Sequence, residues 1–168
     1  MVQEELRFKG RSTRPPKDPV NSMLSFGYSF LYRNIIGAVE RHGLHPHFAF
    51  MHKAARGHAA LASDLVEDLR APIVDRVVME LVNSGEVVPG DFITNEQGAV
   101  YMSRGLMGRF TAALSQLVVR GEPYLSSYGD SRSYGFQAML DRKLDSAIEA
   151  IDTGDATLYR PLLWEPGP

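Results

Sequence analysis

The chain has 168 residues, enough for one domain with a sizeable hydrophobic core. Its hydrophobic content of 44% and charged content of 23% are typical of a globular protein, and its net charge of -2 excludes binding of nucleic acid through a large overall excess of positive charge. The absence of cysteine excludes disulfides, thiolate zinc sites and cysteine nucleophiles, so any metal must be held by histidine or by oxygen ligands.

The N-terminal segment, residues 1–18, is polar and basic and is expected to be a linker or arm that enters a helical domain over 19–155, followed by a C-terminal tail over 156–168. Five of the 18 Lys and Arg residues fall between Arg7 and Lys17. One interpretation is a solvated, partly disordered arm. The other is an arm that contacts DNA phosphates. No signal peptide and no membrane span is evident in the sequence, so we expect a cytoplasmic protein without a membrane partner.

Helical patterns occupy the first half of the domain. Asp18 is expected to cap a helix that begins at Pro19, repeats apolar residues at three- and four-residue steps from Leu24 to Val39, and ends at Gly43. A second helix is predicted over 59–71. A third is expected to be opened by Pro72 and closed by Gly85.

The second half of the domain adds a hairpin and two further helices. The segment around Asn95–Gly98 predicts a tight turn between two short strands. Apolar spacing predicts a helix over 104–119 and another within 133–154, stopped by Gly154. The sum is an all-α fold, a multi-helix domain with one small β-hairpin.

Acidic residues at helical spacing stand out in the second predicted helix. Asp64, Glu67 and Asp68 lie at i, i+3 and i+4 and would share one face. Their mutual repulsion calls for a positive charge, which Arg70, Arg76 or a divalent cation could supply. On a surface helix the same pattern also fits solvated charge with no ligand.

His52 lies 15 residues before Glu67, a distance that suits a strand or loop delivering an imidazole to the start of the following helix. A histidine with carboxylates forms a mixed nitrogen and oxygen site suited to Mg²⁺ or Mn²⁺. The alternative is a core histidine with its hydrogen bonds satisfied.

Three blocks in order carry a family resemblance. The first block, residues 11–32, contains an Arg-Pro-Pro run, an Asp-Pro-x-Asn element and a helix with Leu-Ser and Tyr. The second block, residues 42–52, contains a Gly-Leu-x-Pro turn and an apolar stretch that ends with His. The third block, residues 61–78, contains an Asp-Leu-x-Glu helix followed by Arg and Asp-Arg. Together they resemble the CRISPR-associated integrase that inserts new spacers into the repeat array.

The resemblance implies the helical C-terminal catalytic domain of that integrase and a role for individual residues. It implies that His52 and Glu67 are metal ligands and that Asp64 is a catalytic acidic residue that assists the metal or orients the site. It further implies two sets of supporting positions: DNA-facing Arg70 with Arg11, Arg14 and Lys17 of the arm, and Asn21 and Tyr28 in the helix beside the site.

The implied activity is metal-dependent endonuclease and strand-transfer chemistry, with Mg²⁺ or Mn²⁺, in which the 3′-OH of a prespacer attacks the repeat boundary during antiviral defence. The implied partners are prespacer and repeat DNA, a second copy in a homodimer, and a small dimeric CRISPR adaptation protein contacted by Leu158–Trp164 of the tail.

The family's third metal ligand, a glutamate upstream of the Arg-Pro-Pro run, has no counterpart in this sequence. A catalytically incomplete helical DNA-binding or dimerisation fragment is therefore a second hypothesis. A third is an unrelated helical protein with a solvated acidic face.

Overall fold

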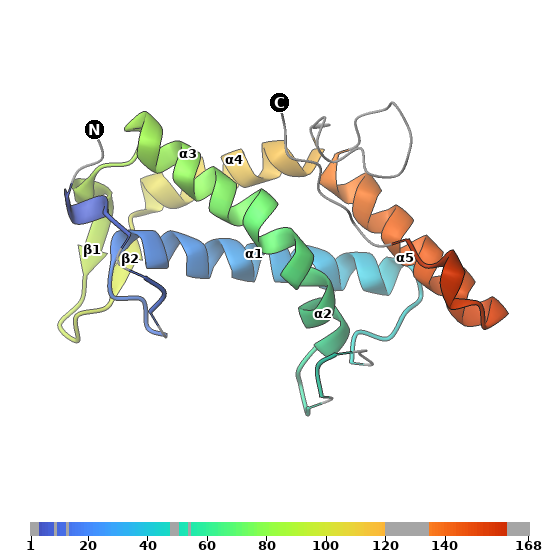
Figure 1. Ribbon diagram of the computed structural model, residues 1–168. Coiled ribbons are helices and arrows are strands. Elements are labelled where there is room, and N and C mark those ends of the chain that lie inside the picture. The colour runs from blue at the N-terminus through green and yellow to red at the C-terminus, as the bar shows by residue number, and fades with distance from the viewer. Residues whose placement is uncertain are drawn as a thin grey trace. The chain divides into compact units, whose positions relative to one another are not determined.

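The computed structural model describes residues 4–8, 10–12, 14–47, 51–53, 55–119 and 135–160. The chain divides into two compact units, Met1–Leu31 with Leu69–Leu114, and Tyr32–Asp68 with Ser115–Pro168. The fold is mostly helical with one two-stranded hairpin, which confirms the predicted fold class (Figure 1). None of the helices in the described ranges has the length and apolar character that a membrane crossing requires.

Helix α1 spans Pro19–Arg41, and local sequence signals set both of its ends. Asp18 Oδ1 accepts a hydrogen bond of 2.8 Å from Asn21 N–H, as expected of a helix cap. At the other end Gly43 adopts a left-handed φ of 72°, and Leu44 N–H donates to the Val39 carbonyl. The prediction of a helix between Asp18 and Gly43 is confirmed.

The prediction that Pro72 opens a separate helix is wrong. Helix α2 (Ala60–Leu69) continues through a π-helical segment, η2 (Arg70–Asp75), into α3 (Arg76–Ser84). Arg76 N–H donates to the carbonyl of Ala71, five residues earlier, so the wider turn accommodates Pro72 without ending the helix. Gly85, with a φ of 79°, ends α3 as predicted.

The first unit contains the hairpin. Strands β1 (Phe92–Thr94) and β2 (Val100–Met102) pair antiparallel, with Ile93 opposite Tyr101. Val100 N–H donates to the Pro16 carbonyl, which ties β2 to the segment just before α1 (Figure 1). A short 3-10 helix, η3 (Pro89–Asp91), precedes β1, and another, η1 (Glu4–Leu6), lies near the N-terminus.

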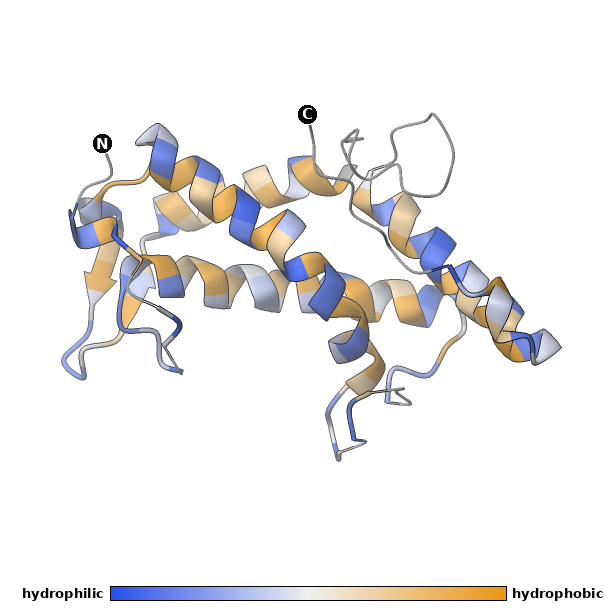
Figure 2. Ribbon diagram, viewed as in Figure 1, coloured by the Kyte–Doolittle hydropathy of each residue, from blue (hydrophilic) through white to orange (hydrophobic). Residues whose placement is uncertain are grey.

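The two remaining helices bury one face each. Helix α4 (Arg104–Val119) buries Leu106, Phe110 and Leu114 at the predicted spacing. In the second unit, α5 spans Phe136–Thr153 and ends at Gly154 as predicted, and Figure 2 shows apolar and polar residues alternating around it. The 3-10 helix η5 (Ala156–Leu158) follows. Residues 161–168, which include most of the predicted partner contact Leu158–Trp164, lie outside the described residues.

Gly27 in α1 lies against Val74 and Phe110. A Cβ atom at this position would overlap Val74 Cγ1 and lie 3.3 Å from Phe110 Cζ. Gly27→Ala is therefore expected to lower the free energy of unfolding by about 1–3 kcal/mol, because overpacking outweighs the gain of about 1 kcal/mol in helix propensity. Urea unfolding followed by circular dichroism measures this change.

Gly37→Ala in the same helix is the matched control. Its Cβ would lie 3.5 Å from the flexible end of Arg41, so this variant should equal or exceed the wild type in stability. Val74→Ala introduced with Gly27→Ala should restore part of the loss. Equal stability of the Gly27→Ala and Gly37→Ala variants would contradict the packing argument.

Candidate functional site

The side chain of Asp64 binds the segment that carries His52. Asp64 is buried in α2, and its Oδ2 accepts a hydrogen bond of 2.9 Å from Met51 N–H. Its Oδ1 accepts from His52 N–H at 3.0 Å and contacts His52 Nδ1 at 2.6 Å. Because a carboxylate can only accept, His52 carries its proton on Nδ1 in the neutral ring, and Nε2 is the nitrogen that can coordinate a metal.

Two aromatic rings support the imidazole of His52 from the same unit. The His58 ring packs edge-on to the His52 ring with centroids 6.2 Å apart, and the Tyr32 ring stacks on His58 at 6.4 Å. His58 Nε2 is 3.1 Å from Ser63 Oγ, and Tyr32 Oη both donates to and accepts from the backbone of Ala59. These contacts fix the orientation of His58 and, through it, one side of His52.

Glu67 lies on α2 less than one turn beyond Asp64 and is exposed, whereas Asp64 is buried. His52, with 42% of its side chain exposed, is also reachable from solvent. A histidine nitrogen and a carboxylate are donors that suit Mg²⁺ or Mn²⁺. Across the described residues, no group of three or more His, Asp or Glu side chains is arranged to hold a metal ion. The pairing of His52 with Glu67 at one metal ion therefore stays a prediction.

The positive charge beside Asp68 comes from a residue that sequence reasoning did not consider. Lys143 of α5, with 3% of its side chain exposed, lies 2.5 Å from Asp68 Oδ2. Lys143 therefore supplies a positive charge beside Asp68 in addition to the candidates expected from the sequence, Arg70, Arg76 or a cation. Arg76 pairs with Glu80 at 2.6 Å.

Tyr28 joins two of the predicted DNA-binding arginines in the first unit. The guanidinium carbons of Arg11 and Arg70 lie 5.2 and 5.1 Å from the centroid of its ring. Its hydroxyl donates to Asp75 Oδ1 at 2.6 Å. Burial, followed by this hydrogen bond, raises the pKa of Tyr28 to about 12, so the phenol keeps its proton at neutral pH.

Asn21, fully buried in α1, anchors the basic arm. Its Oδ1 accepts from Arg11 Nη1 at 2.8 Å and from Ser12 N–H at 3.1 Å, and its Nδ2 donates to the Gly10 carbonyl and to Asp18 Oδ2. Arg14 is also attached to α1, through a 3.3 Å hydrogen bond to Ser29 Oγ. Lys17 is exposed. The described part of the arm is held against the domain with its cations at the surface.

Comparison with known protein families shows the family of this chain. The family model described as CRISPR associated protein Cas1 matches residues 1–116, more than half of the chain. The chain belongs to the Cas1 family. Among curated Cas1 proteins, the CRISPR-associated endonuclease Cas1 of Mycobacterium tuberculosis H37Rv is 45% identical over 155 residues. That match covers 92% of the chain and 45% of the relative, so the chain spans about half the length of this Cas1.

Solved structures of related proteins have a similar fold. A casposase bound to its integration product superposes with a TM-score of 0.79 at 25% identity, over 91% of this chain and 45% of that one. A partial Cas6-RT-Cas1–Cas2 complex shares the fold, with a TM-score of 0.80 at 23% identity, over 99% of this chain and 48% of that one. The helical Cas1 domain predicted from the sequence is confirmed.

Sequence reasoning missed Lys143 and Tyr32. Lys143 lies 75 residues from Asp68, and its apolar neighbours in α5 give no sign of an acidic partner. Tyr32 lies one turn after Tyr28 in α1, which is the single local signal that could have drawn attention to it.

Proposed function

We propose that this chain is the catalytic lobe of a CRISPR adaptation integrase, a metal-dependent DNA endonuclease and strand-transfer enzyme that inserts spacers into the repeat array for antiviral defence in the cytoplasm. Membership of the Cas1 family supports the reaction class. The single observation that supports the site is the contact of buried Asp64 with both the backbone and Nδ1 of His52.

In this proposal His52 Nε2 and Glu67 hold Mg²⁺ or Mn²⁺. Such an ion, when bound, polarises the scissile phosphate and stabilises charge on the leaving 3′-oxygen. Asp64 keeps the imidazole in the Nδ1–H form and directs Nε2 outward, as carboxylates commonly do for metal-binding histidines. Positioning of the DNA then provides much of the acceleration, because few proton transfers by side chains are needed.

Arg70 and the arm residues Arg11, Arg14 and Lys17 are proposed to hold DNA phosphates. Both guanidinium groups approach the ring of Tyr28, which keeps them near one another. Contacts of this kind position DNA without reading its sequence. Prespacer and repeat DNA are the proposed substrates, with a second copy of the chain and a small dimeric adaptation protein as protein partners.

A second candidate function, a module without catalysis, is supported by a separate observation. Within the described residues, His52 and Glu67 are joined by no third donor able to complete a metal site. A helical DNA-binding or dimerisation module without catalysis is consistent with this incomplete set.

An assay of binding and cleavage of branched DNA tests both candidate functions. The integrase predicts slow strand cleavage by the chain in Mn²⁺, none in EDTA, and a higher Mn²⁺ requirement for Glu67→Gln. The exposed Glu40 of α1 supplies a matched control, since Glu40→Gln should leave the Mn²⁺ requirement unchanged. Binding of the branched DNA without cleavage at any Mn²⁺ concentration would establish the module without catalysis, and absence of DNA binding would reject both.

A further inference from the structure

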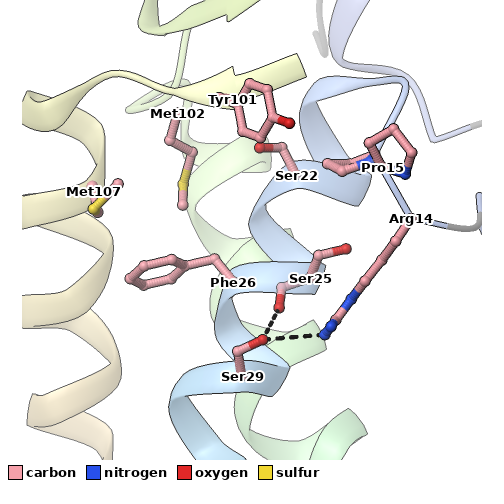
Figure 3. Close-up of a pocket in the computed structure, with 10 residues that line it drawn as sticks. Arg14, Pro15, Ser22, Ser25, Phe26, Ser29, Tyr101, Met102 and Met107 are labelled. Carbon is pink, nitrogen blue, oxygen red and sulfur yellow. Dashed lines mark hydrogen bonds between the residues drawn. The ribbon is translucent and has the colours of Figure 1, made fainter. Parts of the chain in front are cut away.

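Two pockets differ in how far their charged group is exposed to water. The first unit holds a pocket of about 540 Å³ against α1, and Figure 3 shows its cation, Arg14, beside Ser29. Arg14 is exposed and donates to Ser29 Oγ at 3.3 Å. The second unit holds a pocket of about 750 Å³ whose cation, Lys143 of α5, is buried. Because lysine is rarely buried in proteins, the second pocket is the more informative of the two.

The walls of the pocket in the second unit are mostly apolar. Leu61 and Leu65 of α2 line it together with Leu144 and Ile151 of α5 and with Met51. Met51 and Ile151 are 69% and 58% exposed, so part of this apolar surface is open to water. The volume lies within the range of about 300–1,000 Å³ that is usual for small-molecule sites. The walls therefore suit a small ligand with an apolar body.

Lys143 and Asp68 form the polar part of the same pocket. The ammonium group of Lys143 has three N–H donors, and only 3% of the side chain is exposed. Among the described residues its one hydrogen-bond partner is Asp68 Oδ2, and Asp68 Oδ1 accepts no hydrogen bond. Because burying a donor without a partner costs free energy, the pair points to a ligand that supplies an acceptor for Lys143.

The charges of the pocket decide which polar group such a ligand carries. Lys143 and Asp68 offset each other, and the buried carboxylate of Asp64 also lines the pocket, so a ligand carboxylate would be repelled. An alkylamine has no acceptor for Lys143 when protonated and adds a second ammonium group beside it. An amide matches both partners, because its carbonyl accepts and its N–H donates.

We propose that this pocket binds a small apolar molecule that carries an amide group. The amide carbonyl accepts from Lys143, the amide N–H donates to Asp68 Oδ1, and the apolar body lies against Leu65 and Ile151. The site is distinct from the proposed metal ligands, since neither His52 nor Glu67 lines the pocket. Met51 and Asp64 do line it, so a bound molecule lies beside the contact that holds the His52 segment.

Hexanamide is the probe for this site, and hexanoate and hexylamine are comparators with the same number of carbon atoms. Each is titrated against the full chain and followed by saturation-transfer NMR. Hexanamide should bind about 10- to 150-fold more tightly than either comparator, because each comparator loses one hydrogen bond to a charged group. This measurement needs neither metal nor DNA.

The Lys143→Met variant should reverse the preference between two of the probes. It removes the ammonium donors and keeps an apolar side chain, so hexanamide should bind about 10- to 150-fold more weakly. Hexylamine should bind more tightly than it does to the wild type, because its ammonium group can then pair with Asp68. Circular dichroism verifies that the variant is folded.

Filling the pocket provides a second test that leaves the ion pair intact. Ala150→Leu places a larger side chain in the pocket wall and should weaken hexanamide binding by at least about tenfold. Ala112→Leu is the matched control, because Ala112 is an exposed alanine of α4 that does not line the pocket. It should bind hexanamide as the wild type does.

The proposal fails if hexanamide shows no saturable binding at concentrations up to about 10 mM. Equal affinity for the three probes, or hexanamide binding that is unchanged in Lys143→Met and Ala150→Leu, would also overturn it. Glu67→Gln separates this result from the proposed function: it should raise the Mn²⁺ requirement of DNA cleavage but leave hexanamide binding unchanged, since Glu67 does not line the pocket.

Discussion

The Asp64→Asn substitution is expected to lower both the Mn²⁺ affinity of the chain and its rate of branched-DNA cleavage by about 10- to 100-fold, the usual cost of losing a hydrogen bond that supports a metal-binding histidine. His52→Ala is expected to abolish both. Manganese binding followed by electron paramagnetic resonance and cleavage followed on denaturing gels measure the two effects.

The geometry of Asp64 explains why an isosteric amide does not suffice. Oδ1 takes both His52 donors and Oδ2 takes Met51 N–H, so every one of these contacts needs an acceptor. An asparagine has one acceptor oxygen, and its NH₂ group must face either Met51 or His52. The imidazole then loses its fixed Nδ1–H form or the segment moves, and each buried unsatisfied donor costs about 1–3 kcal/mol.

Asp145→Asn provides the control for this prediction, because Asp145 lies in the same unit with 70% of its side chain exposed. It should change Mn²⁺ affinity by less than about twofold. Nitrogen chemical shifts of His52 supply an independent readout, since they report which ring nitrogen carries the proton. Robust cleavage that persists in His52→Ala would refute the site assignment.

The Asp68→Ala substitution is expected to lower the free energy of unfolding by about 3 kcal/mol, toward the lower end of the range for breaking a buried ion pair. Lys143 would be left with its ammonium group buried and without the carboxylate 2.5 Å away. The lower end applies because Asp68 itself is 43% exposed, so water already screens part of the interaction. Urea unfolding monitored by circular dichroism gives the value.

The double variant Asp68→Ala with Lys143→Met should recover most of this loss, since a thioether of similar length needs no counter-charge. Glu149→Ala, an exposed carboxylate on α5, should change stability by no more than about 0.5 kcal/mol. If the changes in the free energy of unfolding caused by Asp68→Ala and Lys143→Met simply add in the double variant, Asp68 and Lys143 do not stabilise each other.

Local signals predicted much of the fold, because helix ends are set by neighbours in sequence. Asp18 and Gly43 mark the two ends of α1, and Gly85 and Gly154 end α3 and α5. Pro72 misled the prediction, because a proline within a helical pattern is favoured in the first turn of a helix. Its accommodation depends on the π-helical turn, which no local rule indicates.

The candidate site was less predictable. Asp64, Glu67 and Asp68 were expected to share one helix face, yet Asp64 is buried against the His52 segment while Asp68 pairs with Lys143. The contact of Asp68 with Lys143 depends on tertiary packing. The metal roles of His52 and Glu67 rest on the family resemblance and stay predictions.

Asn21 holds Arg11 with a neutral amide oxygen, and this choice of group has a consequence for the proposed contact of Arg11 with DNA. A carboxylate in its place would have cancelled the guanidinium charge while orienting it. The amide fixes Arg11 and leaves its charge to act at a distance, so Arg11 is pre-organised and, in the proposed DNA-binding role, would lose less conformational entropy on binding. In that role, electrostatic attraction of the phosphate backbone would speed association with a guanidinium group already in place.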